Sequence, residues 1–131
     1  MNESGYMQIT LVLVVVLSVL LSAGSQVLLK FGMSSPEMTS AVANDETLRL
    51  ALRIAATPTV LLGLACFGFS AVAWLFVLSK LPLSTAYPFV ALGIAISVAA
   101  GRLLFNEPIS AVKLIGVSLI IVGVGTVSAS S

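Results

Sequence analysis

The chain has 131 residues, of which 59% are hydrophobic and 8% are charged, and its mean hydropathy is +1.17. That composition lies far from the range of soluble globular proteins and predicts an integral membrane protein. The formal net charge of +1 gives no basic surface for nucleic acid, and the sequence holds no nucleic-acid-binding motif. Because His is absent and Cys66 is the single cysteine, the sequence excludes a disulfide framework, a His/Cys metal site and His-based catalysis.

The first apolar run is expected to stay in the protein as a membrane helix. Its N-terminal flank, MNESGYMQ, carries Glu3 and no Lys or Arg, whereas a signal peptide begins with a basic segment. The run is also long enough to span a bilayer. These two features favour a retained helix over a cleaved signal peptide.

Hydrophobicity and helix breakers predict four transmembrane helices, at about residues 7–31, 58–79, 84–105 and 110–128. KLPLS (80–84) separates the second helix from the third, and FNEPIS (105–110) separates the third from the fourth. Because these connections are short, we expect consecutive helices to be antiparallel neighbours. The predicted fold class is an all-α integral membrane protein, with residues 1–131 in a single domain.

The long connection, residues 32–57, divides into two parts. Its first part, GMSSPEMTSAVAND, has the composition of a loop. The second part, DETLRLALRIAAT, predicts a short helix whose apolar face holds Leu48, Leu52 and Ala55 and whose charged face holds Glu46, Arg49 and Arg53. This helix is either an interfacial helix with its arginines near lipid phosphates or a solvated lead-in to the second span.

Basic residues are distributed unevenly between the two sides of the predicted bundle. The side of the 32–57 connection and of FNEPIS holds Lys30, Arg49, Arg53, Arg102 and Lys113, and the other side holds Lys80. The positive-inside rule therefore places both termini outside the cytoplasm.

One face of the first span is polar although the span is otherwise built of Leu and Val. Its polar residues, within about 140° of a helical wheel, are Ser18, Ser22, Ser25, Gln26 and Lys30. One interpretation is the polar wall of a cavity, with Lys30 near the headgroups as a phosphate partner. The alternative is that the serines bond backbone carbonyls and that the lysine extends to the membrane surface.

No Asp or Glu lies inside any predicted span, and Glu107, at the end of the third, is the nearest. Proton-coupled pumps rely on intramembrane carboxylates, so a proton/cation exchange site is hard to build here. The sequence also lacks a nucleophile–base pair, a phosphate loop and a metal-ligand cluster. We therefore expect neither an enzyme nor a cofactor or metal.

Small residues mark the last two spans as packing surfaces. In the third span Ala91, Ala95 and Ala99 recur every four residues, and in the fourth Gly116 and Gly123 lie seven apart on one face. Such rows allow helices to approach closely or to form a dimer seam. Since four helices of this length enclose little volume, we expect a dimer to be the working unit.

Three segments, SQVLLK (25–30), WLFVLSKLPLSTAYP (74–88) and LLFNEPIS (103–110), resemble the four-helix branch of the drug/metabolite transporter superfamily in their order and spacing. The similarity is greatest to the small subunits that flip undecaprenyl-phosphate-linked aminoarabinose. The resemblance implies a multi-pass protein of the bacterial inner membrane that moves a polyprenyl-phosphate lipid, with or without a sugar. It also implies a homodimer, or a heterodimer with a similar four-helix chain.

The small multidrug resistance family is also similar in length and helix count. Its defining carboxylate in the first helix would fall at Ser22 when counted back from Lys30. Export of small solutes therefore stays an alternative without its usual proton-carrying residue. A third possibility is a non-transporting membrane subunit of a glycosyltransferase system.

The flippase interpretation assigns a role to each candidate site residue. Lys30 and Arg102, at the predicted cytoplasmic level, would receive the anionic head through charge-assisted hydrogen bonds. Gln26, Ser22 and Tyr87 would line its route with neutral partners, although Tyr87 also fits an interfacial anchor.

Two further candidates have mainly structural interpretations. Trp74 fits an aromatic belt slightly better than ligand contact. Glu107 is expected to form a structural latch by pairing with Arg102 or Lys113 around the turn between the third and fourth helices.

Overall fold

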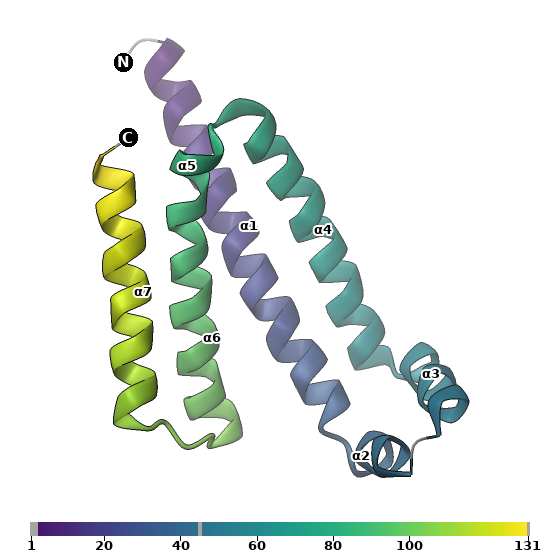
Figure 1. Ribbon diagram of the computed structural model, residues 1–131. Coiled ribbons are helices and arrows are strands. Elements are labelled where there is room, and N and C mark those ends of the chain that lie inside the picture. Colours follow the sequence, from purple (N-terminus) through teal and green to yellow (C-terminus); the bar gives the residue numbers. More distant parts are fainter. Residues whose placement is uncertain (1–2, 45, 131) are drawn as a thin grey trace.

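The computed structural model describes residues 3–44 and 46–130, and every secondary-structure element within those ranges is helical (Figure 1). In chain order the elements are α1 (Glu3–Met33), α2 (Pro36–Ala43), α3 (Thr47–Ala56), α4 (Pro58–Lys80), α5 (Leu83–Ala86), the 3-10 helix η1 (Tyr87–Phe89), α6 (Val90–Phe105) and α7 (Ala111–Ala129). The two chain ends lie at one end of the bundle. α2, α3 and the connection between α6 and α7 lie at the other (Figure 1).

Among the described residues, three helical stretches are long and apolar enough to cross a membrane. They are Gly5–Met33 in α1, Pro58–Lys80, which is α4, and Leu83–Phe105, which runs through α5, η1 and α6. A shorter apolar stretch, Ala111–Val127, makes up most of α7. The fold class expected from composition is therefore confirmed as an all-helical, multi-pass membrane protein.

The packing order of the helices differs from their order in the chain. α4 packs along α1, α6 also packs on α1, and α7 packs on α6. The expectation that the second and third spans would be close neighbours is corrected, because α5 and η1 carry the chain from α4 to the other side of α1 (Figure 1). α1 is thus the shared surface between α4 and α6.

Two glycines allow α1 and α4 to approach closely. A Cβ on Gly63 would lie 2.9 Å from the Leu29 side chain and 3.1 Å from the Leu29 backbone nitrogen. A Cβ on Gly32 would lie 2.5 Å from Cγ2 of Val60. Because real Cβ atoms do not tolerate such distances, the contact between the two helices depends on both glycines.

The outer part of this contact is closed by apolar side chains. Val15 of α1, Val77 of α4 and Ala86 of α5 are fully buried together, and Trp74 and Phe89 pack against them. The row of glycines on α7 behaves differently: beside Gly116 and Gly123 there is open space in the described part of the chain. The seam predicted there is therefore unused within one copy.

Buried serines are bonded to backbone carbonyls. Ser18 Oγ donates to Val15 O at 2.8 Å, and Ser25 Oγ donates to Ser22 O at 2.6 Å. Ser70 Oγ of α4 donates across the helix contact to Ser18 O at 2.9 Å. The structural interpretation of the serines is thus correct for Ser18 and Ser25.

The first part of the 32–57 connection, predicted to be a loop, forms α2. Ser35 caps this helix by accepting a hydrogen bond from the Met38 backbone N–H at 3.4 Å, and Pro36 occupies its first turn. Met38 and Ala41 are buried, so these two apolar side chains anchor the helix to the rest of the protein. The helix was missed because its apolar pattern is short and is interrupted by Thr39 and Ser40, although Ser-Pro-Glu is a good start signal.

α3 lies in the segment for which the pattern predicts a short helix, and Asp45, which begins that segment, lies outside the described residues. Its Leu48 and Leu52 are 76% and 63% exposed. On the charged face Arg53 pairs with Glu37 of α2. This ion pair joins the two short helices.

The α1–α4 contact predicts a clear difference between two glycines of one helix. Gly63→Ala should lower the free energy of unfolding by about 1–3 kcal/mol, because the new Cβ collides with Leu29. The matched control Gly68→Ala, where nothing lies within 4 Å, should leave it unchanged or raise it by up to about 1 kcal/mol. Denaturant unfolding in detergent measures both variants, and equal effects would contradict the packing described.

Candidate functional site

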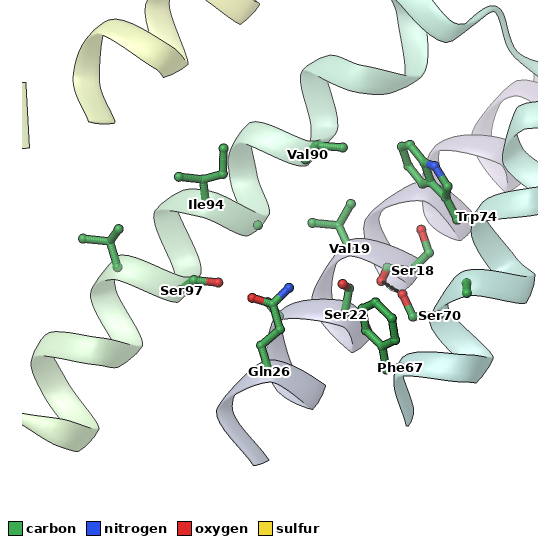
Figure 2. Close-up of a pocket in the computed structure, with 14 residues that line it drawn as sticks. Ser18, Val19, Ser22, Gln26, Phe67, Ser70, Trp74, Val90, Ile94 and Ser97 are labelled. Carbon is green, nitrogen blue, oxygen red and sulfur yellow. Dashed lines mark hydrogen bonds between the residues drawn. The ribbon is translucent and has the colours of Figure 1, made fainter. Parts of the chain in front are cut away.

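A cavity of about 450 Å³ lies between α1, α4 and α6 (Figure 2). Each helix contributes one stripe of side chains to its wall. These are Ser18, Val19, Ser22, Ala23 and Gln26 from α1, Phe67, Ser70, Ala71 and Trp74 from α4, and Val90, Gly93, Ile94, Ser97 and Val98 from α6. The cavity exists because α4 and α6 pack on different sides of α1.

The polar part of the wall comes mainly from α1. Ser18, Ser22 and Gln26 follow one another at intervals of four residues, so the helix places them on one face. The Gln26 side chain extends from α1 toward Ser97 of α6, and Ser22 lies beside it (Figure 2). The structure thus brings together two of the residues that the sequence marks as candidates.

Hydrogen bonding separates these polar groups into two sets. The Ser18 and Ser70 hydroxyls are engaged by backbone carbonyls. Within the described residues, the Ser22 hydroxyl, the Gln26 amide and the Ser97 hydroxyl have no hydrogen-bond partner. An amide offers two donors and an acceptor oxygen, so this second set can bind the hydroxyl groups of a ligand.

The described wall of the cavity contains no Asp, Glu, Lys or Arg. Its chemistry is therefore that of neutral hydrogen bonding surrounded by apolar contacts. Such a surface suits an uncharged polar group attached to an apolar one, and it offers no carboxylate to hold a proton or pair with a cation.

Charge appears one helical turn beyond Gln26, at the end of α1. Lys30 Nζ lies 3.5 Å from Oε1 of Glu107, which follows α6. Both side chains are partly exposed. The pairing of Glu107 with Arg102 or Lys113, expected from the sequence, is corrected, because Lys30 is its partner among the described residues.

The turn after α6 explains this change of partner. Asn106 adopts a left-handed conformation, with φ of 51°, and the Glu107 backbone N–H donates to Gly101 O at 3.1 Å. These features end the helix with a turn that closes on itself. The turn directs the Glu107 carboxylate over Gly101, whose missing Cβ would lie 2.9 Å from Oε2.

Arg102, another candidate, lies exposed in the last turn of α6. It does not line the cavity and makes no ion pair within the described part of the chain. The structure therefore places Arg102 at the same end of the bundle as Lys30 without joining the two.

The aromatic candidates lie toward the other end of the cavity. Trp74 lines the wall of the cavity. Its ring lies 6.3 Å from that of Tyr87, with an interplanar angle of 69°. Tyr87 is exposed and is not part of the wall.

Sequence reasoning missed the contribution of α4. Phe67, Ser70 and Trp74 are spaced three and four residues apart, so they share one face of the helix. That spacing, with a hydroxyl in the middle of an apolar span, was the available signal. Ser97 was not among the candidates either, because it lies in a span rich in small residues.

Comparisons with known proteins show the family of the chain. The profile of the Small Multidrug Resistance protein family matches residues 38–120. A protein of Serratia proteamaculans named probable 4-amino-4-deoxy-L-arabinose-phosphoundecaprenol flippase subunit ArnE is 40% identical over 113 residues, covering 86% of this chain and 90% of the relative. No solved structure matches the chain.

Two Pseudomonas relatives match over shorter stretches. An ArnE-named protein of Pseudomonas syringae is 40% identical over 70 residues, 53% of this chain and 65% of the relative. An ArnF-named flippase subunit of Pseudomonas fluorescens is 38% identical over 80 residues, which cover 60% of this chain and 58% of the relative. The matches thus span less than two thirds of both Pseudomonas proteins.

Fold and site define a multi-pass helical membrane protein of transporter type, with a polar cavity between its helices. The chain belongs to the small multidrug resistance family, and its similarity to the flippase subunits confirms the resemblance read from the sequence.

The hydrogen bond between α4 and α1 makes the cavity wall testable. Ser70→Ala should lower the free energy of unfolding by about 0.6–1.7 kcal/mol, the range for hydrogen bonds between membrane helices. The matched control is Ser79→Ala, because Ser79 bonds Phe76 O of its own helix and its loss should have almost no effect. Unfolding in detergent gives both values, and a loss as large in the control would contradict the assignment.

Proposed function

We propose that this protein is a flippase subunit that moves a polyprenyl-phosphate-linked lipid, with or without a sugar, across the bacterial inner membrane. The observation that carries the proposal is the polar face of α1, where Ser22 and Gln26 open onto a neutral cavity and Lys30 follows one turn later. The lipid has groups that match these two features: a polar head for the neutral cavity and an anionic phosphate for Lys30. The names of the relatives support this choice of substrate.

In this proposal each part of the lipid meets the matching chemistry. Lys30 receives the phosphate through a charge-assisted hydrogen bond, and Arg102 adds positive charge at the same end. Ser22, Gln26 and Ser97 exchange hydrogen bonds with sugar hydroxyls inside the cavity. Trp74 supplies an apolar face to the sugar, Tyr87 borders the far end of the route, and the polyprenyl tail stays in hydrocarbon.

The proposal also includes a fourth crossing and a partner chain. α7 has 19 residues, about 28 Å of helix, which nearly equals the thickness of the hydrocarbon core. Its exposed apolar side chains include Val112, Ile115, Leu119 and Val122. This surface and the open space beside Gly116 suit a second four-helix chain, either an identical copy or a related subunit, as the ArnE and ArnF names of relatives indicate.

At the opposite end of the bundle from the termini, we place α3 at the membrane surface on the cytoplasmic side. Its exposed Leu48 and Leu52 would enter the headgroup region, and Arg49 on the other face would meet lipid phosphates. The distribution of Lys and Arg supports this orientation.

Two other functions fit the observations less well. Proton-driven export of small cations needs a carboxylate in the membrane, and the described cavity wall offers neutral side chains only. A non-transporting subunit of a glycosyltransferase would not need a cavity with unbonded polar groups. Transport by membranes that contain the chain but lack such an enzyme separates this second alternative from the proposal.

Lys30→Ala tests the phosphate site. Loss of a charged hydrogen bond should weaken binding of undecaprenyl phosphate roughly tenfold or more. Trp74 is the single tryptophan and lines the cavity, so its fluorescence during titration with the lipid measures the affinity. Lys80→Ala, which removes a lysine from the other end of the bundle, is the control and should bind normally; unchanged binding by Lys30→Ala would refute the role of Lys30.

A further inference from the structure

The Lys30–Glu107 contact places an anion of the protein itself on the cation assigned to the lipid phosphate. The Glu107 carboxylate already lies 3.5 Å from Lys30 Nζ. A phosphate that approaches Nζ from the cavity must therefore either share the ammonium group with this carboxylate or displace it. We propose that Glu107 is an internal competitor for the phosphate, so that lipid binding displaces the carboxylate and frees α1 from the α6–α7 turn. This inference rests on the proposed function and adds a determinant of affinity and selectivity to it.

The backbone, more than the side chain, determines where the Glu107 carboxylate lies. The left-handed Asn106 and the hydrogen bond from the Glu107 N–H to Gly101 O fix the direction of the residue. The absent side chain of Gly101 then leaves room for the carboxylate against α6. The carboxylate is therefore held in position for Lys30 before any ligand arrives.

The stability of α6 does not explain why Glu107 and Gly101 occupy their positions. A negative charge near the C-terminus of a helix is unfavourable, because the last carbonyls carry partial negative charge. A glycine directly before the last turn, Gly101, also costs helix stability relative to alanine. Both features become intelligible if their role is to present a carboxylate to Lys30.

The ion pair is weak enough to be displaced. The Lys30 and Glu107 side chains are 55% and 38% exposed, and their charged atoms are 3.5 Å apart. Exposed pairs of this kind contribute little, since water and salt screen them. A polyprenyl phosphate without a sugar is a phosphate monoester, which carries up to twice the charge of a carboxylate and three acceptor oxygens, so it should win this competition.

Displacement would also loosen one end of the bundle. The ion pair connects the end of α1 with the turn after α6, and the rings of Phe31 and Phe105 meet beside it with centroids 6.2 Å apart. Without the ion pair, the aromatic contact between Phe31 and Phe105 remains between the two segments near that level. Binding of the phosphate thus breaks the Lys30–Glu107 ion pair at the end of the bundle where the head group would enter.

Glu107→Gln tests the proposal directly. It removes the competing charge, so undecaprenyl phosphate should bind roughly two- to fivefold more tightly than to the unchanged protein. The matched control is Glu37→Gln, which removes the same charge from α2, a helix at the same end of the bundle (Figure 1). Glu37 pairs with Arg53 instead of Lys30. That control should bind normally, and polyprenol, which lacks the phosphate, should show no difference among the three proteins.

A second variant covers the case in which Glu107→Gln does not fold. Gly101→Ala keeps both charges but pushes the carboxylate away from its position over α6, and should also tighten phosphate binding. Equal or weaker binding by a folded Glu107→Gln protein, or by Gly101→Ala if that is the variant that folds, would overturn the competitor role. Weaker binding by Lys30→Ala in the same titrations would then leave the proposed function standing, whereas unchanged binding by Lys30→Ala would remove the phosphate site itself.

Discussion

A polar side chain exposed to hydrocarbon costs free energy unless it is bonded or shielded, and α1 carries several such side chains on one face. The helix meets this constraint by packing on both α4 and α6. Where α4 approaches α1, Gly63 packs against Leu29, and further along the contact the Ser70 hydroxyl donates to Ser18 O. Where α6 stands further off, the remaining polar groups face a cavity. The site is thus a product of how α1 is shielded.

Much of this arrangement could be predicted from the sequence. Apolar runs of membrane length locate α1, α4 and α6, and the four-residue spacing of Ser18, Ser22 and Gln26 places them on one face. What the periodicity could not give was the packing order of the helices. That order depends on the path of α5 and η1, which is set by tertiary contacts, and it decides that Ser70 and Ser97 also line the cavity.

Local signals also explain what was predicted incorrectly. The partner of Glu107 depends on one left-handed residue, Asn106, which turns the chain by an amount that residue spacing does not record. α2 was overlooked because its apolar pattern is weak, although its cap, Ser35, was an available signal. The conformation of a single residue, Asn106, thus determines that Glu107 pairs with Lys30, and composition does not reveal it.

Movement of the lipid is the central claim, and a transport measurement tests it most directly. Inverted inner-membrane vesicles would be prepared from the host bacterium without the chain, with it and with the Lys30→Ala variant, so that any partner subunit is present. A fluorescent polyprenyl phosphate and a membrane-impermeant quencher then report how fast the lipid changes leaflet. The account predicts faster exchange in vesicles with the unchanged chain and a return to the background rate with Lys30→Ala. Equal rates in all three preparations would contradict it.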